Sequence, residues 1–341
     1  MGDTESRGAA IDAVGVELTY SDGTEAVKGI DLEVPGGEFF GFLGPNGAGK
    51  TTTIKTFTTL LSPTGGTISV NGYDVVSEAQ QVRESIGYMA QETSVDLELT
   101  ARENVRFAAQ AYGVPRERRA DRIDELLDLV DLADVADKRA DEFSGGMKKR
   151  LDVATALVHD PPLVFLDEPT TGLDPKARNR LWEYFERINE QGTTLFLTTQ
   201  YLEEADALCD RLAVILDGEI VAEGSPMELK RRVGGEILDV DLADPDERDR
   251  AAEIAREADV FDSDADVTVS DDGISVTAQR AREHGTDLLV ALRDADITVT
   301  GFNIRAPTLD DVFLSITGEQ PDLDDDDGDD ATGPATEVRA E

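Results

Sequence analysis

The segment 44–51, Gly-Pro-Asn-Gly-Ala-Gly-Lys-Thr, constrains the fold of this chain more than any other stretch. It follows the apolar run 39–43, which predicts a buried strand, and residues 51–61 after it have spacing typical of a helix. The glycines let the backbone curl around a polyphosphate, so that the loop N–H groups and the positive helix N-terminus face the anion. A strand, a glycine loop and a helix in this order predict an α/β fold with a nucleotide site.

Two side chains at the end of this loop have specific roles in the predicted site. Lys50 can reach the β- and γ-phosphates of a nucleotide, and the Thr51 hydroxyl can ligate Mg²⁺. Tyr20, ahead of the loop, is a candidate for stacking on a purine, although an aromatic residue on a strand more often belongs to a core. The predicted nucleotide-binding residues of the loop are Gly44, Pro45, Asn46, Gly47, Ala48, Gly49, Lys50, Thr51 and Thr52.

The net charge of −41 over 341 residues restricts the partners of the chain. The tail 319–341 holds ten acidic residues and one arginine, so the rest of the chain still carries −32. Acidity spread over the whole fold, with few basic clusters, argues against nucleic-acid binding. It favours a protein of a halophile, because at very high salt the Debye length falls to ~3 Å and self-repulsion is quenched. An ordinary acidic protein is the alternative.

The sequence also restricts the compartment. Residues 1–9 are polar and acidic rather than signal-like, and no stretch approaches the ~18–20 apolar residues of a membrane span. Cys209 is the only cysteine, so there is no intrachain disulfide. We therefore expect a soluble cytoplasmic chain.

The pattern along the chain predicts two domains and two disordered ends. Residues 1–12 are expected to be disordered, 13–233 to form the α/β domain with a helical subdomain at about 99–160, and 236–318 to form a small α+β domain. This second domain has the order β-α-β-β-α-β, which fits a ferredoxin-like fold. The low-complexity acidic tail 319–341 is expected to be disordered.

The helical subdomain is predicted by a change in periodicity at residue 99. Thr100 and Glu103 form a capping-box pattern, which predicts a helix N-terminus. Apolar residues then recur with helical spacing on one face, at Ile123, Leu126, Leu127 and Val130.

Polar residues follow three of the predicted strands. Asp167 and Glu168 come directly after the apolar run 163–166, and ligands of α/β sheets bind at the carboxyl ends of strands. Gln91 and Gln200 each follow another predicted strand. A glutamine in such a position, taken alone, is more often a solvated loop residue than a ligand.

Two further segments begin helices. Ser144, Gly145 and Gly146 precede Met147 and a predicted helix, which makes a second anion-binding N-terminus. Asp174 precedes Pro175 at the start of another predicted helix. Each segment alone is most often an ordinary helix cap.

The ordered set of these segments resembles the ATP-binding subunits of ABC transporters. The resemblance covers roughly residues 13–230 and includes the phosphate loop, Gln91, the signature sequence at Ser144, the Walker B carboxylates and the loop at Asp174. The segment 307–314, Pro-Thr-Leu-Asp-Asp-Val-Phe-Leu, is similar to the daunorubicin-resistance type of multidrug-exporter ATPase. The family also implies two partners, a second copy of the chain and an ABC-2-type permease that brings it to the inner face of the membrane.

The resemblance implies a role for each residue. Thr51, Gln91 and Asp167 hold Mg²⁺, while Lys50 and the metal neutralise the charge of ATP. Glu168 orients or activates the attacking water. The family's signature acts in trans, so Ser144, Gly145 and Gly146 cover the nucleotide of the opposite subunit, and Asp174 lies at the dimer seam.

One position departs from the family pattern and leaves the mechanism less defined. Most members carry a histidine that contacts the γ-phosphate, where this chain has Gln200. A glutamine there is similar to the daunorubicin-resistance subgroup, and its amide can donate a hydrogen bond but does not titrate near neutrality.

Two other functions compete with an exporter subunit. A soluble ABC ATPase without a transport role usually carries long coiled coils, a second cassette or basic arms, and this sequence has none of these. A module that holds ATP without hydrolysing it is suggested by Gln200 alone, and Glu168 argues against it. Cargo is chosen by the permease, so the sequence does not identify it.

Overall fold

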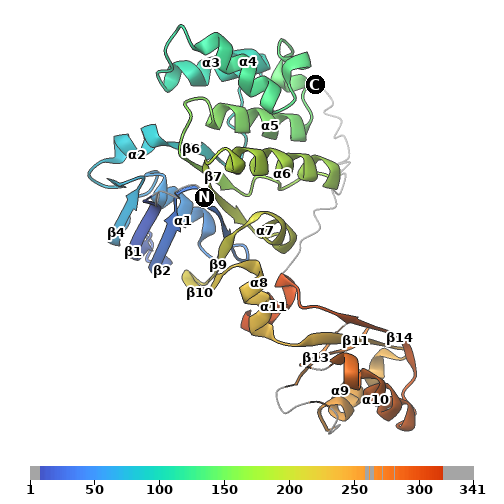
Figure 1. Ribbon diagram of the computed structural model, residues 1–341. Helices are drawn as coiled ribbons and strands as arrows, with labels where there is room; N and C mark the ends of the chain where they lie inside the picture. The colour runs from blue at the N-terminus through green and yellow to red at the C-terminus, as the bar shows by residue number, and fades with distance from the viewer. Residues whose placement is uncertain (1–7, 258–260, 262–264, 271, 280, 318–341) are drawn as a thin grey trace, which may run out of the picture.

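The computed structural model describes residues 8–257, 261, 265–270, 272–279 and 281–317, and the predicted tail 319–341 lies outside them. Figure 1 shows a larger N-terminal part, with a central sheet below a helical layer, and a smaller C-terminal part at the other end of the molecule. Both parts mix helices and strands, as the sequence predicts.

The central sheet is built from six mostly parallel strands in the order β10-β9-β3-β8-β7-β6. Its strands are β3 (Phe39–Leu43), β6 (Ile86–Met89), β7 (Leu163–Asp167), β8 (Thr194–Thr199), β9 (Arg211–Leu216) and β10 (Glu219–Gly224). Leu43 pairs with Thr199, and Asp167 with Thr198, so the carboxyl ends of β3, β7 and β8 lie side by side. Residues that follow these strands are therefore brought to one edge of the sheet.

An antiparallel sheet, in the order β2-β1-β4-β5, packs on the first helix. Its strands are β1 (Ala9–Thr19), β2 (Glu25–Pro35), β4 (Gly65–Val70) and β5 (Tyr73–Asp74). The helix α1 (Lys50–Phe57) lies between this sheet and the central one. The rings of Phe57 in α1 and Phe196 in β8 pack in a T-shaped arrangement there, with their centroids 5.8 Å apart. The helix predicted at 51–61 is shorter than expected, because Thr59 has a φ of +65°, which ends it.

The prediction that residues 1–12 are disordered is wrong from residue 9 onward. Ala9 begins β1, and Ile11 is completely buried opposite Val34 of β2. Register shifts in this pair break the simple alternation of apolar and polar residues, which hid the start of the strand. Residues 1–7 lie outside the described part of the chain.

Helices cover the central sheet. They are α2 (Ala79–Ser85), α3 (Ala101–Ala111), α4 (Arg119–Leu129), α5 (Gly145–Ala156), α6 (Pro175–Glu190), α7 (Leu202–Leu208) and α8 (Pro226–Val233). Of these, α3, α4 and α5 lie within residues 99–160, where the helical subdomain was predicted. The capping box of Thr100 and Glu103 is present at the start of α3. The predicted apolar face of α4, with Val130 after it, is buried in the core that α3, α5 and α6 share.

The C-terminal part has the predicted ferredoxin-like topology. Its four strands lie antiparallel in the order β12-β13-β11-β14, and helices α9 and α10 pack on one face. These elements are β11 (Glu236–Leu242), α9 (Arg248–Glu257), β12 (Asp266–Val269), β13 (Gly273–Ala278), α10 (Ala281–Asp294) and β14 (Val299–Arg305).

A last helix, α11 (Leu309–Thr317), was not predicted. It falls in the segment 236–318 expected for the C-terminal domain, yet it packs on α8 of the N-terminal part (Figure 1). Leu309, Val312 and Phe313 are buried in the same core as Leu229 of α8. The chain therefore crosses to the C-terminal domain after α8 and returns to α8.

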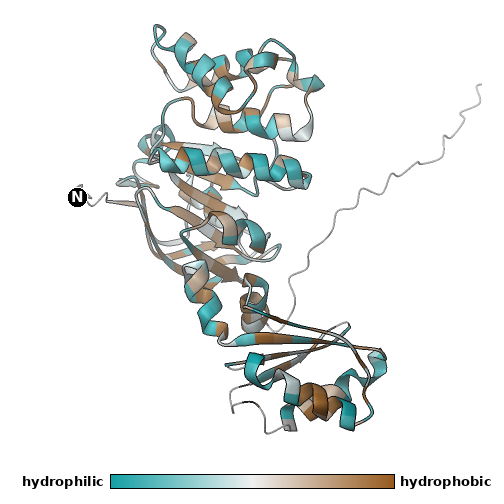
Figure 2. Cartoon of the chain, turned by 45° about the vertical axis from the view of Figure 1, so that its right-hand side comes forward, coloured by the Kyte–Doolittle hydropathy of each residue, from teal (hydrophilic) through white to brown (hydrophobic). Residues whose placement is uncertain are grey.

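Hydropathy follows this architecture. Figure 2 shows hydrophobic strands inside the N-terminal part and a largely hydrophilic outer face on α6. Along the described stretches of the chain, we find no helix with the length and apolar character needed to cross a membrane.

Candidate active site

The phosphate loop joins β3 to α1 at the carboxyl edge of the central sheet (Figure 1). Gly47 and Gly49 have φ of +83° and +109°, which L side chains rarely adopt. A Cβ on Gly49 would also lie 2.5 Å from the carbonyl oxygen of Ala26 on β2. The loop therefore needs glycine there for its backbone conformation and for the close approach of its neighbour.

Lys50 lies buried at the centre of the loop. Its Nζ donates to the carbonyl oxygens of Gly44 at 2.7 Å and Pro45 at 3.1 Å, and lies 3.3 Å from Glu168 Oε1. Burial lowers the pKa of the Lys50 ammonium, and the nearby Glu168 and Asp167 carboxylates oppose that shift. A buried ammonium held by carbonyl oxygens is placed to exchange these acceptors for phosphate oxygens.

Asp167 is the last residue of β7, beside the phosphate loop, and its carboxylate accepts hydrogen bonds from three hydroxyl groups. Thr198 Oγ1 of β8 donates to Asp167 Oδ1 at 2.7 Å, and Thr51 Oγ1 donates to the same oxygen at 3.3 Å. Tyr88 of β6 donates to Oδ2 at 3.5 Å, and burial together with Asp167 raises the pKa of the Tyr88 phenol. The hydroxyl of Thr51 and the carboxylate of Asp167 thus form a pair of hard oxygen ligands at the phosphate loop, which fits Mg²⁺.

Glu168 follows Asp167 in a left-handed backbone conformation with a φ of +46°. Such a conformation costs ~1–3 kcal/mol for a residue other than glycine, and it often occurs at functional sites. The Glu168 amide donates to the carbonyl oxygen of Thr198 at 3.1 Å. The strained turn directs the carboxylate toward the loop, between Lys50 and Gln91, whose Nε2 donates to Glu168 Oε2 at 3.0 Å.

The segment at Gln91 is connected to the helical subdomain. Lys149 of α5 donates from Nζ to the backbone oxygen of Gln91 at 2.6 Å. Burial lowers the pKa of the Lys149 ammonium. A movement of α5 would therefore act directly on the position of Gln91, and through it on Glu168.

A cavity of about 370 Å³ opens over the phosphate loop. Tyr20 forms part of its wall, is 40% exposed, and its hydroxyl lies 3.0 Å from Thr52 Oγ1. The stacking of a purine on Tyr20 remains a prediction, for which this position is suitable. The predicted residues that line the cavity are Tyr20, Asn46, Gly47, Gly49, Lys50, Thr51, Thr52, Gln91 and Glu168.

The other predicted site residues do not line this cavity. Ser144 caps α5 by accepting from the Met147 amide at 3.3 Å, with Gly145 and Gly146 in the first turn. Asp174 caps α6 by accepting from the Ala177 amide at 2.8 Å. Gln200 follows β8 and is half-buried. One chain therefore brings the loop and the carboxylates together and keeps the signature apart.

Sequence reasoning missed Thr198, Tyr88 and Lys149. Thr198 and Tyr88 reach Asp167 from the two strands that flank β7. Thr198 lies in the strand that precedes Gln200. Had β7 and β8 been taken as neighbouring strands, this position would have indicated that Thr198 lies opposite Asp167. Lys149 stands among other basic residues of α5, which is typical of a solvated helix face, yet its ammonium is partly buried against Gln91.

Comparisons with protein families match both parts of the chain. Residues 27–171 match the family model described as ABC transporter, and residues 224–317 match the model described as ATP-binding protein DrrA1-3-like, C-terminal domain.

Curated relatives match almost the whole length. The chain is 43% identical over 317 residues to the daunorubicin/doxorubicin resistance ATP-binding protein DrrA of Streptomyces peucetius, which covers 92% of this chain and 94% of the relative. It is 39% identical over 312 residues to the doxorubicin resistance ATP-binding protein DrrA of Mycobacterium tuberculosis, covering 89% and 92%. It is 38% identical over 314 residues to the Nod factor export ATP-binding protein I of Burkholderia lata, covering 92% and 98%.

Solved structures resemble the N-terminal part. A subunit of an ABC transporter complex from Clostridium perfringens gives a TM-score of 0.61 at 29% identity, covering 66% of this chain and 94% of that one. A dimeric ATP-binding cassette with bound ADP and Pi gives a TM-score of 0.58 at 28% identity, covering 63% and 98%.

The fold and the loop define a phosphate-loop ATPase of the ATP-binding cassette class. The chain belongs to the ABC transporter ATP-binding family, in the branch with a DrrA-like C-terminal domain. It is an ATP-binding and ATP-hydrolysing subunit of an ABC exporter. The predicted family, fold class, enzyme class and function are confirmed, whereas the halophilic origin remains a prediction.

Proposed function

We propose that two copies of this chain close around ATP and drive export through an ABC-2-type permease at the inner face of the cell membrane. One observation carries the proposal. The phosphate loop, Asp167 and Glu168 form one half of a hydrolytic site, while the signature at Ser144 lies outside the cavity of its own chain. A second copy supplies the missing half, in keeping with the dimeric cassette among the similar structures.

Each side chain then has a role in hydrolysis. Thr51, Asp167 and the Gln91 amide oxygen hold Mg²⁺, which neutralises phosphate charge when bound. Lys50 exchanges its carbonyl contacts for phosphate oxygens, and the amide of Gln200 donates to the γ-phosphate. Glu168 accepts a hydrogen bond from the attacking water and orients it.

The partner copy covers the phosphates. The N–H groups at the start of α5, from Ser144, Gly145 and Gly146 of that copy, face the γ-phosphate at a helix N-terminus. Asp174 lies at the seam between the copies.

The test of this function is the variant Glu168→Gln. Glutamine keeps the shape and the contact with Gln91 but no longer accepts a proton, so we expect ATPase turnover to fall at least ~100-fold. ATP binding should persist, because Lys50 and the loop are intact, and the variant should accumulate as a two-chain complex with ATP. Steady-state ATPase assays and light scattering measure the two effects.

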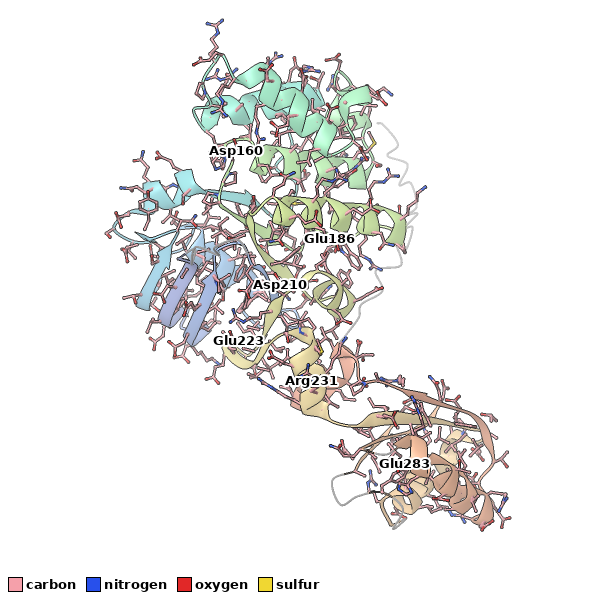
Figure 3. All side chains as sticks on the ribbon, in the orientation of Figure 1. Asp160, Glu186, Asp210, Glu223, Arg231 and Glu283 are labelled. Atoms are coloured by element: carbon pink, nitrogen blue, oxygen red, sulfur yellow. The ribbon has the colours of Figure 1, made fainter. Side chains whose placement is uncertain are left out.

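The matched control is Glu186→Gln on the exposed face of α6 (Figure 3), which should leave turnover unchanged. If Glu168→Gln kept more than ~10% of the turnover, far above the loss expected for a general base, Glu168 would not position the water.

The permease docks on the helical subdomain. Phe107 of α3 is 68% exposed, Tyr112 is 43% exposed, and residues 104–116 contain no acid in a chain with 73 acidic residues. Exposed apolar side chains on a surface without repulsive charge are typical of a protein contact.

The docking site is tested by co-purification with an ABC-2-type permease that is produced together with this chain. Phe107→Glu should reduce the permease recovered at least ~10-fold, because it buries a charge in the contact. Leu60→Glu, at a residue that is 56% exposed outside this subdomain, is the control and should have no effect. Equal recovery with both variants would exclude α3 as the docking site.

The relatives named for drug resistance and Nod factor export favour an amphipathic or hydrophobic cargo. A soluble ABC ATPase without a transport role is the alternative. Such an ATPase would hydrolyse ATP normally, and no permease would co-purify with it.

A further inference from the structure

Asp152 is a buried carboxylate on α5, about two turns after the signature residues at the start of that helix. Only 2% of its surface is exposed. Burial raises the pKa of the Asp152 carboxyl, while hydrogen bonds from Thr93 and Ser94 and the ammonium of Lys149 oppose this shift. Burying a carboxylate is costly unless the group is well hydrogen-bonded, so the contacts of Asp152 are important for its role.

Asp152 holds the irregular segment 91–99, which joins β6 to α3. Its Oδ1 accepts hydrogen bonds from the Ser94 amide at 3.0 Å and from Ser94 Oγ at 2.7 Å. A segment without helix or strand obtains few backbone hydrogen bonds from its own residues, so its conformation depends on side chains of this kind. Asp152 therefore fixes the position of the residues that directly follow β6.

Lys149 holds the start of the same segment. It precedes Asp152 by three residues, so both side chains lie on one face of α5. Its Nζ donates to the backbone oxygen of Gln91 at 2.6 Å, and the Gln91 side chain donates to Glu168 Oε2 at 3.0 Å. The carboxylate of Asp152 also favours the charged form of the Lys149 ammonium. Contacts thus connect Asp152 to the carboxylate that is proposed to orient the attacking water.

The other end of the segment is attached to α3. Asn104, which is 6% exposed, accepts from the Asp96 amide at 2.8 Å and donates to the Asp96 carbonyl oxygen at 3.0 Å. Val95 is buried in the core that α3 and α5 share. Loss of the Asp152 carboxylate would therefore release the residues around Ser94 and leave the attachment at Asp96 in place.

We propose that Asp152 is a positioning residue for ATP hydrolysis, which acts through Ser94 and Lys149 to hold Gln91 against Glu168. The inference rests on the proposed roles of Gln91 and Glu168 in hydrolysis. Because α5 begins with the signature residues that are proposed to cover the partner's nucleotide, this helix then connects the two ATP sites of the dimer.

The test is steady-state ATP hydrolysis by the full chain in high KCl, with the affinity for a fluorescent ATP analogue measured separately by titration. Asp152→Ala removes the acceptor of Ser94 and should lower kcat ~10–100-fold, the range for groups that orient ligands of a metal. The dissociation constant of the analogue should change less than ~3-fold, because Lys50 and the phosphate loop are intact. Asp152→Asn keeps an acceptor oxygen for Ser94 and should retain most of the turnover.

Two further variants separate positioning from a loss of stability. Tyr184→Phe removes a buried hydrogen bond to Asp131 Oδ2, 2.6 Å long, in the same core but away from the segment 91–99. It should lower the melting temperature and leave kcat unchanged. Gln91→Ala should lower kcat, and adding Asp152→Ala to it should lower kcat no further, because both changes remove the same contact with Glu168.

The proposal is overturned if Asp152→Ala keeps the wild-type kcat, if Tyr184→Phe lowers kcat equally, or if the losses of Gln91→Ala and Asp152→Ala multiply. If circular dichroism shows that Asp152→Ala does not fold, Ser94→Ala decides. It removes the bond of the exposed Ser94 hydroxyl and should lower kcat about 2–10-fold, the shift that one hydrogen bond typically contributes. Unchanged turnover of Ser94→Ala would then overturn the proposal. The proposed function fails separately, if Glu168→Gln retains its turnover.

Discussion

Asp167 shows how much of the site depends on a single hydroxyl. Thr198 Oγ1 donates to Asp167 Oδ1 at 2.7 Å. The same hydroxyl accepts a hydrogen bond from the Glu168 amide at 3.2 Å. It therefore positions both carboxylates of the site from a strand that carries neither. Groups that orient metal ligands in this way typically contribute ~10–100-fold to metal affinity or activity.

We predict that Thr198→Val lowers ATPase turnover ~10-fold or more and raises the Mg²⁺ concentration needed for half-maximal activity. Valine has the shape of threonine without the hydroxyl, so Asp167 loses its shortest hydrogen bond. Titration of ATPase activity with Mg²⁺ measures the effect. Thr194→Val, at the other end of β8, is the control. Identical Mg²⁺ curves for both variants would contradict the role of Thr198.

The candidate site was predictable wherever its residues are consecutive in the sequence. The loop 44–52 and the pair Asp167-Glu168 can be recognised because each is a local pattern with a local reason. Thr198 and Tyr88 reach the site through the register between neighbouring strands, which a single sequence does not specify. Lys149 required knowledge of how α5 packs against the loop at Gln91.

At the scale of elements, α11 determines how the C-terminal domain is attached. Phe313 is 5% exposed and packs in the core that contains Leu229 of α8. Arg305, at the end of β14, donates to Asp239 of β11 at 2.7 Å and to Asp311 of α11 at 2.6 Å. The Arg305 guanidinium therefore links the first strand (β11) and the last strand (β14) of the domain to α11.

We predict that Phe313→Ala destabilises the protein by ~3–5 kcal/mol, the cost of truncating a buried phenylalanine. The urea midpoint of unfolding should shift to lower concentration. Phe302→Ala is the matched control, because Phe302 is 59% exposed, and it should change the midpoint little. If the two variants behaved alike, α11 would not be anchored on α8.

The elements found correctly from sequence are those with a continuous apolar run between strong breakers. The strand 39–43 has the predicted bounds for this reason. The helix α2 was missed because Val82 is its only buried residue, and β5 because it has two residues. The segment 307–314 was noticed as a family pattern, while its amphipathic helical character was not used.

At the scale of the whole molecule, the excess of acid controls stability. Like charges repel across the folded surface, and salt screens this repulsion. We predict that the melting temperature rises steeply between ~0.2 M and ~2 M KCl, measured by thermal unfolding under matched pH.

Glycine betaine at the same osmolality is the control, because it is excluded from protein surfaces without screening charge. If betaine and KCl raised the melting temperature equally, the acidity would have no special role in adaptation to salt.

The return of the chain to α8 has a mechanical consequence. The C-terminal domain leaves through Gly234 and Gly235, both at positive φ, and comes back at Arg305, so two neighbouring crossings join it to the ATPase. Two adjacent chain crossings allow the C-terminal domain to tilt about the line that joins them. They hinder its rotation about other axes. Force applied to this domain from outside would therefore reach the ATPase as a torque on α8, delivered along one axis.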